Sequence, residues 1–446
     1  MRRALYTALF HLAAPIALAR LWWRGRREPG YRRNIGERFG RYPQVEAQTR
    51  DARRPLLWLH AVSVGEVRGA APLVRALREG YADHRMLVTC TTAAGRETAL
   101  QLFGETASVA YLPYDLPWVV TRFLDHFRPR LALVMETEVW PNLLAACRAR
   151  GVPAVLANAR LSEKSARGYR RLGTLAASAF ASFSAVCAQD AASAERLREL
   201  GAGDLTITGN LKFDAEPDTG KLEEGRALKA LLAGRKVLLL ASTRDGEEQL
   251  LLDALVPVLP RLDGALLVLV PRHPQRFDAV AAQVAERGLA LARRSAGTHG
   301  TAPDPATTVY LGDTMGEMAL YYALADVAVI GGSFAPFGAQ NLIEACAAGV
   351  PVVIGPSIYN FPEATRLACE AGAALQVRDA TEAAQTATAL LADADRRGQM
   401  GEAGVRLCTA HRGATARHLA VIRSVLDVPG VVPDVADLPD ASAGRG

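Results

Sequence analysis

The chain has 446 residues, half of them apolar and 22% charged, and its formal net charge is +6. This length exceeds that of a single hydrophobic core, so we expect two domains of roughly 200 residues each, and the composition is too apolar for a disordered protein. Much of the positive excess lies near the N-terminus, which suits an anionic membrane surface better than a nucleic acid. The six cysteines are far apart and form no C-x-x-C pair. A disulfide framework or cysteine zinc site is therefore not expected, and a reducing cytoplasm fits.

An apolar stretch from Ala4 to Trp23 opens the chain, and a cluster of arginines follows it. A secretory signal would carry its main charge before the apolar stretch, so cleavage is not expected. The pattern favours a membrane-associated helix over residues 1–30, with Trp22 at headgroup level and the arginines on anionic lipid phosphates. The positive-inside bias then predicts that the main body of the chain lies at the cytoplasmic face of the membrane. The alternative is a helix docked on its own domain.

Short β-rich runs alternate with helical patterns along the rest of the chain, which is typical of a parallel sheet covered by helices. Strands are predicted at residues 56–62, 86–91, 109–112, 131–135, 154–157 and 185–188, and then at 236–241, 265–270, 309–312, 327–330 and 352–354. The sequence thus predicts an α/β protein of two Rossmann-like domains, residues 31–215 and 216–426, facing each other across a cleft. The charged segment 214–224 is predicted to be a linker, and the aperiodic residues 427–446 a disordered tail.

Ligands of open α/β sheets bind beyond the carboxyl ends of the strands, so polar residues there are candidate site residues. Glu66 follows the first predicted strand, at the start of a helical pattern, and Glu136 follows the strand at 131–135. Lys212 lies just before the predicted linker. An acidic residue in a first helical turn also has an ordinary explanation in the helix dipole, and a lone lysine is usually solvated.

The second domain supplies candidate groups for an anionic ligand. Arg272 follows Pro271 at the end of a predicted strand, and its guanidinium matches phosphate or carboxylate. The segment Met315, Gly316 and Glu317 opens a helix whose N–H groups could hold a phosphate, although a plain helix cap explains it equally well. After a glycine-rich turn come Asn341, Leu342, Ile343 and Glu344, an arrangement in which a carboxylate binds a ribose hydroxyl.

These motifs resemble those of the transferases of 3-deoxy-D-manno-oct-2-ulosonic acid (Kdo), glycosyltransferase family 30. The resemblance is carried by HAVSVGE, YLPYDLP, METEVWPN, NARLS, TGNLKFD, VPRHP, GDTMGE and NLIEA. It implies the GT-B architecture, an inverting reaction without metal or other cofactor, CMP-Kdo as the donor and lipid IVA, a lipid A precursor, as the acceptor. Lipopolysaccharide synthesis at the inner membrane is the implied setting.

The resemblance also implies residue roles. Glu66 would be the general base, and Glu136 and Lys212 would assist at the transition state. Contacts with CMP would come from Pro271, Arg272, Met315, Gly316, Glu317, Asn341, Leu342, Ile343 and Glu344. One departure is Gln340, where many members have histidine, although glutamine still donates and accepts hydrogen bonds.

Two alternatives remain open at this point. One is another GT-B enzyme, or a sugar-nucleotide epimerase, that uses a UDP-sugar. The other is a non-catalytic nucleotide-binding protein tethered to the membrane, which would leave the glutamates at the strand ends without a role.

Overall fold

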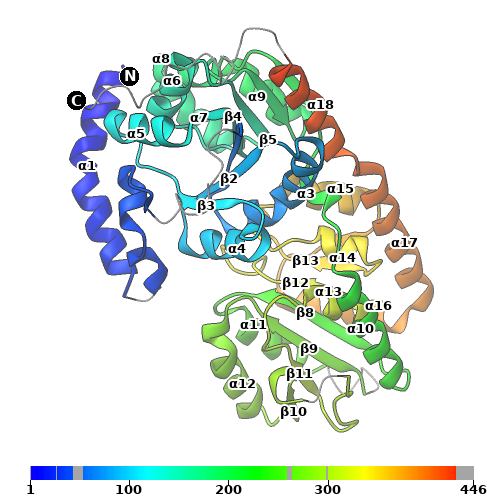
Figure 1. Ribbon diagram of the computed structural model, residues 1–446. Helices are drawn as coiled ribbons and strands as arrows, with labels where there is room; N and C mark the ends of the chain where they lie inside the picture. Colours follow the sequence, from blue (N-terminus) through cyan, green and yellow to red (C-terminus); the bar gives the residue numbers. More distant parts are fainter. Residues whose placement is uncertain (1, 27, 44–53, 259–263, 298–299, 428–446) are drawn as a thin grey trace, which may run out of the picture. The chain divides into compact units, whose positions relative to one another are not determined.

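The computed structural model describes residues 2–26, 28–43, 54–258, 264–297 and 300–427 in two compact units (Figure 1). The first unit holds the described residues up to Ala215 together with those from Arg412 onward, and the second spans Glu216–His411. Each unit contains one parallel sheet with helices, so the predicted α/β class with two Rossmann-like domains is confirmed. The tail predicted at residues 427–446 lies, beyond its first residue, outside the described residues.

The first unit is built on a seven-stranded parallel sheet in the order β3-β2-β1-β4-β5-β6-β7. Its strands are β1 Leu56–His60, β2 Arg85–Cys90, β3 Ser108–Tyr111, β4 Pro129–Met135, β5 Ala154–Ala159, β6 Ala185–Ala188 and β7 Leu205–Ile207. Its helices are α1 Arg3–Arg24, α3 Val64–Gly80, α4 Ala93–Phe103, α5 Pro117–Phe127, α6 Pro141–Ala149, α7 Glu163–Leu172, α8 Thr174–Phe180, α9 Ala191–Glu199 and α18 Ala414–Leu426. The central strands are buried on both faces, which explains their continuous apolar runs.

The second unit repeats this architecture, with the strand order β10-β11-β9-β8-β12-β13-β14. Its strands are β8 Val237–Thr243, β9 Leu266–Pro271, β10 Leu291–Arg293, β11 Val309–Leu311, β12 Val327–Ile330, β13 Val352–Ile354 and β14 Ala374–Gln376. Its helices are α10 Thr219–Leu231, α11 Glu247–Leu255, α12 Phe277–Glu286, α13 Met318–Leu324, α14 Ile343–Ala347, α15 Pro362–Glu370, α16 Ala380–Ala392 and α17 Ala394–His411. All predicted strands are present. The short strands β7, β10 and β14 were not predicted, because most of their residues are partly or fully exposed and they lack the continuous apolar run of the buried strands.

The predicted linker at 214–224 is wrong in its second half, because α10 begins at Thr219. Asp218 caps this helix by accepting a hydrogen bond from the N–H of Lys221 at 3.0 Å. A charged helix start has the composition of a linker. Here Lys221 and Glu224 of α10 form ion pairs within the second unit.

The assignment of residues 216–426 to the second domain also needs correction, because α18 packs in the first unit. Ala414, Ile422 and Leu426 of this helix are buried in the apolar core formed by α3 and one face of the first sheet. His418 accepts a hydrogen bond from the N–H of Asn158 at 3.0 Å. An amphipathic pattern shows that a helix packs on a core, but not on which one.

Helix α1 has the length and mean hydropathy needed to cross a membrane, and none of its residues is buried. Its exposed apolar side chains include Leu5, Leu9, Leu12 and Ile16. The side chains of Tyr6, Thr7 and Phe10 instead contact the first unit. The helix is therefore docked along one side, as the alternative interpretation expected, and bare along another, while its association with a membrane stays a prediction.

Candidate functional site

Glu66 lies in the first turn of α3, just beyond the carboxyl end of β1. Its Oε2 accepts a hydrogen bond from the N–H of Val62 at 2.8 Å, and its Oε1 accepts one from Ser63 Oγ at 3.3 Å. Burial, together with the negative charge of Glu136, raises the pKa of Glu66 to about 8. A carboxyl with that pKa can take up and release a proton near neutral pH, as general acid–base catalysis requires.

Glu136 and Lys212 form an ion pair in the same unit. Lys212 Nζ lies 3.2 Å from Glu136 Oε1, and each side chain is only 15% exposed. Glu136 follows β4 with a φ of 54°, a left-handed conformation that is uncommon for a residue other than glycine, and its N–H donates to the Ala157 carbonyl at 2.9 Å. Such backbone conformations are frequent at functional sites. The structure thus brings Glu66, Glu136 and Lys212 together at the end of β1 and β4.

The turn that carries Lys212 is held from two sides. The Oδ1 of Asn158 accepts a hydrogen bond from the N–H of Leu211 at 3.0 Å, and the Asp214 carboxylate accepts hydrogen bonds from the first N–H groups of α18. The lysine stem runs over Gly69, where a β-carbon would lie 3.5 Å from the Cγ and Cε atoms of Lys212. Sequence reasoning missed these supports. Asn158 and Asp214 lie within the motifs NARLS and TGNLKFD, whereas Gly69 lies outside the motifs.

A further acid, Glu138, lies in the loop between β4 and α6. Its Oε2 accepts a hydrogen bond from Trp140 Nε1 at 3.1 Å, and burial raises its pKa. The charge of Glu138 adds to the effect of Glu136 on the pKa of Glu66. Tyr169 donates to the carbonyl of Thr137 at 3.2 Å, which fixes the middle of the loop.

In the second unit, Pro271 is buried at the end of β9 and Arg272 is partly exposed after it. The N–H of Arg272 donates to the carbonyl of Thr243 at 2.9 Å, which joins the ends of β9 and β8. Behind them, the buried carboxylate of Glu248 accepts hydrogen bonds from Thr243 Oγ1 and Arg276, both at 2.8 Å. Arg272 therefore extends from a rigid strand end.

The segment 315–317 divides into an exposed part and a buried part. Met315 is 52% exposed, and Gly316 is exposed with a φ of 82°, so their backbone is accessible. Glu317 is buried and pairs with Arg294 at 3.1 Å and Lys221 at 2.7 Å. Although burial opposes ionisation, hydrogen bonds from Arg294, Lys221 and Thr314 lower the pKa of Glu317 to about 2. Its carboxylate is engaged within the protein and fixes the shape of this loop.

The residues at 341–344 surround the start of α14. Asn341 accepts a hydrogen bond from the N–H of Ile343 at 3.1 Å and donates to Glu344 Oε1 at 2.9 Å. Glu344 is exposed, whereas Leu342 and Ile343 are buried and can offer a ligand only backbone groups. The preceding glycine turn is held by Glu247, whose buried carboxylate accepts hydrogen bonds from the N–H groups of Gly332 and Phe334 at 2.6 and 2.8 Å. Sequence reasoning missed Glu247, which has the pattern of an ordinary acid in a first helical turn.

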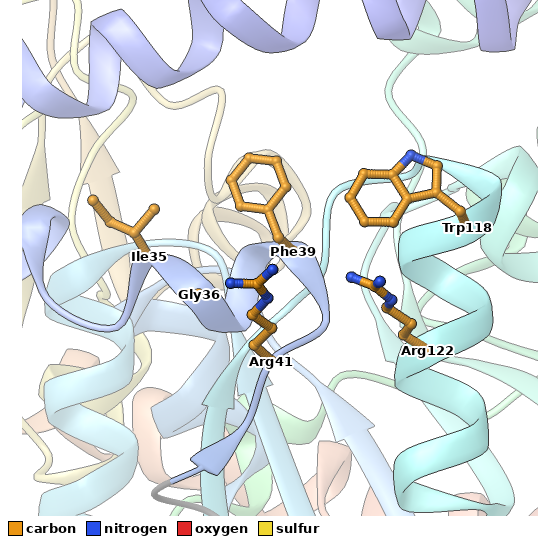
Figure 2. Close-up of a pocket in the computed structure, with 6 residues that line it drawn as sticks. All are labelled: Ile35, Gly36, Phe39, Arg41, Trp118 and Arg122. Atoms are coloured by element: carbon orange, nitrogen blue, oxygen red, sulfur yellow. The ribbon is translucent and has the colours of Figure 1, made fainter.

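A hollow of about 290 Å³ lies on the first unit between the 3₁₀ turn Ile35–Phe39 and α5. Figure 2 shows the rings of Phe39 and Trp118 at its edge and the guanidinium groups of Arg41 and Arg122 below them. Arg122 also lies over the Trp118 ring, 5.0 Å from its centroid. Apolar and cationic groups side by side match the two chemical parts of a membrane amphiphile, and sequence reasoning had not identified this hollow.

No cluster of three or more His, Cys, Asp or Glu side chains that could hold a metal ion occurs within the part of the chain that the structure describes. The acidic side chains near Glu66 are instead paired with Lys212 or with backbone and indole N–H groups.

Comparison with known proteins agrees with this architecture. Residues 33–215 match the family described as 3-deoxy-D-manno-octulosonic-acid transferase, and residues 303–406 match glycosyl transferases group 1. The chain is 46% identical over 435 residues to a 3-deoxy-D-manno-octulosonic acid transferase of Bordetella pertussis, covering 96% of this chain and 100% of the relative. It is 35% identical over 431 residues to that of Haemophilus influenzae, covering 96% and 99%.

A similar fold occurs in the crystal structure of UDP-GlcNAc 2-epimerase from Neisseria meningitidis bound to UDP-GlcNAc. The TM-score is 0.56 at 15% identity, over 83% of this chain and all of that one. At this level of identity, the similarity concerns the fold alone.

Proposed function

Because the chain belongs to the family of 3-deoxy-D-manno-octulosonic acid transferases and is a glycosyltransferase, we propose that it moves Kdo from CMP-Kdo to lipid IVA. The activity class rests on the identities of 46% and 35% to two such transferases, each over nearly the full length of both chains. The choice of donor and acceptor rests on the resemblance of its motifs to those of the family.

In the proposed reaction, a hydroxyl of the acceptor attacks the anomeric carbon of Kdo while the bond to the CMP phosphate breaks. Glu66 accepts the hydroxyl proton, and CMP leaves as an anion. The raised pKa of Glu66 supports this role, because a carboxyl that binds a proton readily near neutral pH is an effective general base. The two hydrogen bonds to its oxygens orient it on the first turn of α3.

Glu136 and Lys212 act as a pair in this proposal. The ammonium of Lys212 stabilises negative charge that develops during transfer, and Glu136 holds the ammonium in place. The packing of the lysine stem on Gly69, one helical turn beyond Glu66, supports a fixed distance between base and cation.

The donor nucleotide binds the second unit in this proposal. Arg272 supplies charge to the phosphate, and the accessible backbone at Met315 and Gly316 supplies N–H donors. Glu344, exposed beside Asn341, accepts a hydrogen bond from a ribose hydroxyl. The carboxylate of Glu317 shapes the loop through Arg294 and Lys221, so its contact with the nucleotide would come from its backbone.

The acceptor is proposed to be presented at the cytoplasmic face of the inner membrane. The exposed apolar side of α1 and the hollow with Arg41 and Arg122 support contact with an anionic lipid surface. Arg26 and Arg32 lie over the Trp22 ring at 4.8 and 4.6 Å, as expected where aromatic and basic groups share the headgroup layer.

The decisive experiment incubates the purified full chain with CMP-Kdo and lipid IVA, then measures CMP release and the mass of the product. A product heavier by one or more Kdo units supports the proposal and counts the residues added. Release of UDP from a UDP-sugar, without CMP release from CMP-Kdo, would instead favour the alternative UDP-sugar enzyme. Binding without any turnover would favour the non-catalytic protein.

A further inference from the structure

Helix α1 contacts the rest of the first unit close to the loop that carries Glu136 and Glu138. The hydroxyl of Tyr6 donates to Asp115 Oδ2 at 2.9 Å, and that of Thr7 donates to Asn142 Oδ1 at 3.1 Å. The ring of Phe10 meets that of Trp140 edge-on, with centroids 6.3 Å apart and planes at 90°. Tyr6 and Phe10 are four residues apart and therefore lie on the same side of the helix.

Asp115, the partner of Tyr6, fixes the start of α6. Its buried carboxylate accepts hydrogen bonds from the N–H groups of Asn142 at 3.0 Å and Leu143 at 2.7 Å. Its own carbonyl accepts a further bond from Asn142 Nδ2 at 2.7 Å. The first N–H groups of a helix lack partners within it, so Asp115 supplies a cap from a distant part of the chain.

Helix α6 begins immediately after the loop at residues 136–140, which we call the catalytic loop. Trp140, the partner of Phe10, closes this loop and donates from its indole to Glu138 Oε2 at 3.1 Å. The charge of Glu138 acts on Glu66, and Glu136 at the other end of the loop holds Lys212. Phe10 of α1 thus contacts Trp140 at the end of the catalytic loop. Tyr6 contacts Asp115, which caps the helix that follows the loop.

We propose that α1 is a positioning element for the catalytic loop, with Phe10 holding Trp140 and Tyr6 holding the Asp115 cap of α6. This inference rests on the proposed function, because it assigns the loop to the transfer reaction. The bare side of α1 carries Leu5, Leu9, Leu12 and Ile16, so the helix that would face lipid also orients the loop. Tyr6, Phe10 and Trp140 are positioning residues in this scheme and do not touch the substrate.

The test compares the full chain with Tyr6→Phe, Phe10→Ala and Trp140→Phe, using acceptor dispersed in detergent so that turnover does not need membrane binding. Each variant is expected to lower kcat about tenfold and to leave the KM for the donor unchanged. Phe10→Ala and Trp140→Phe should also move the alkaline rise of the pH–rate profile to lower pH, because Glu138 then moves away from Glu66. The matched controls, Leu12→Ala and Ile16→Ala on the bare side, should keep kcat and weaken flotation with lipid vesicles.

Wild-type kcat and pH profile in Tyr6→Phe and Trp140→Phe would overturn the inference. Each of these two variants removes one hydrogen-bonding group and keeps an aromatic ring at the position. They therefore decide the matter even if Phe10→Ala fails to fold, which a thermal melt reveals. If the wild-type chain itself releases no CMP from CMP-Kdo, the proposed function has failed. If the wild type is active and the variants match it, only the positioning role has failed.

Discussion

Replacing Glu66 by glutamine should abolish transfer and, at the same time, stabilise the fold in a pH-dependent manner. The pKa of Glu66 rises from 4.5 to about 8 on folding, so between these values the folded state binds more protons than the unfolded state. The free energy of unfolding of the wild type therefore falls as pH rises through this window. About two and a half pH units separate 4.5 from neutrality, each worth about 1.4 kcal/mol, which gives a cost of about 3 to 4 kcal/mol at pH 7. Glutamine does not titrate and avoids this cost.

The assay combines denaturant unfolding of Glu66→Gln and wild type at about pH 4.5 and pH 8 with a transfer assay. The stability difference between the two proteins should be small at the acid end and should widen toward the alkaline end. Transfer should fall roughly a hundredfold or more, since a general base is lost. Glu79→Gln, exposed on the same helix, is the matched control and should change neither property. A constant stability difference across the pH range would refute the reasoning from burial, and retention of more than about a tenth of the rate would refute the catalytic role.

If Glu66 is the general base, kcat/KM should rise with pH and level off above about pH 8, because only the ionised carboxylate accepts a proton. A profile that is flat through neutrality would contradict this role. Calorimetry should show CMP binding about tenfold weaker in Arg272→Ala and in Glu344→Ala, because each variant loses one good polar contact. The control Arg366→Ala on α15 should leave the affinity unchanged. If Arg272→Ala and Glu344→Ala also bind CMP as the wild type does, the donor site lies elsewhere. Replacing Trp22 and Trp23 by alanine should reduce flotation with phosphatidylglycerol vesicles, and the remaining binding should fall as salt is raised; full retention at high salt would exclude this contact.

The fold class followed from the sequence because the physics that sets it is local. Strands buried on both faces need continuous apolar runs, and these runs alternate with helical patterns in both halves of the chain. Polar residues at the carboxyl ends of these runs then became candidate site residues. This rule singled out Glu66 and Glu136, whereas Lys212 was a candidate because it lies just before the predicted linker. The structure brings the three together in the first unit.

The packing of α18 and the partners of the candidate side chains depended on tertiary structure. Helix α18 has an apolar side that fits either core by pattern alone, and only its buried contacts and the bond between His418 and Asn158 assign it to the first unit. Glu317 and Glu344 are both acids near a helix start, yet one is buried in ion pairs and the other is exposed. Burial and partners are long-range properties, and no spacing along the chain encodes them.

Helix α1 shows the same division most clearly. Its composition determined that it is apolar, uncharged in its middle and followed by arginines, which favours contact with lipid. Only the tertiary structure decided that Tyr6 and Phe10 turn toward Asp115 and Trp140, while Leu12 and Ile16 stay bare. The reason is physical: apolar burial is non-directional and can be satisfied by lipid or by protein, whereas a hydrogen bond or a ring contact exists only where folding brings its second partner.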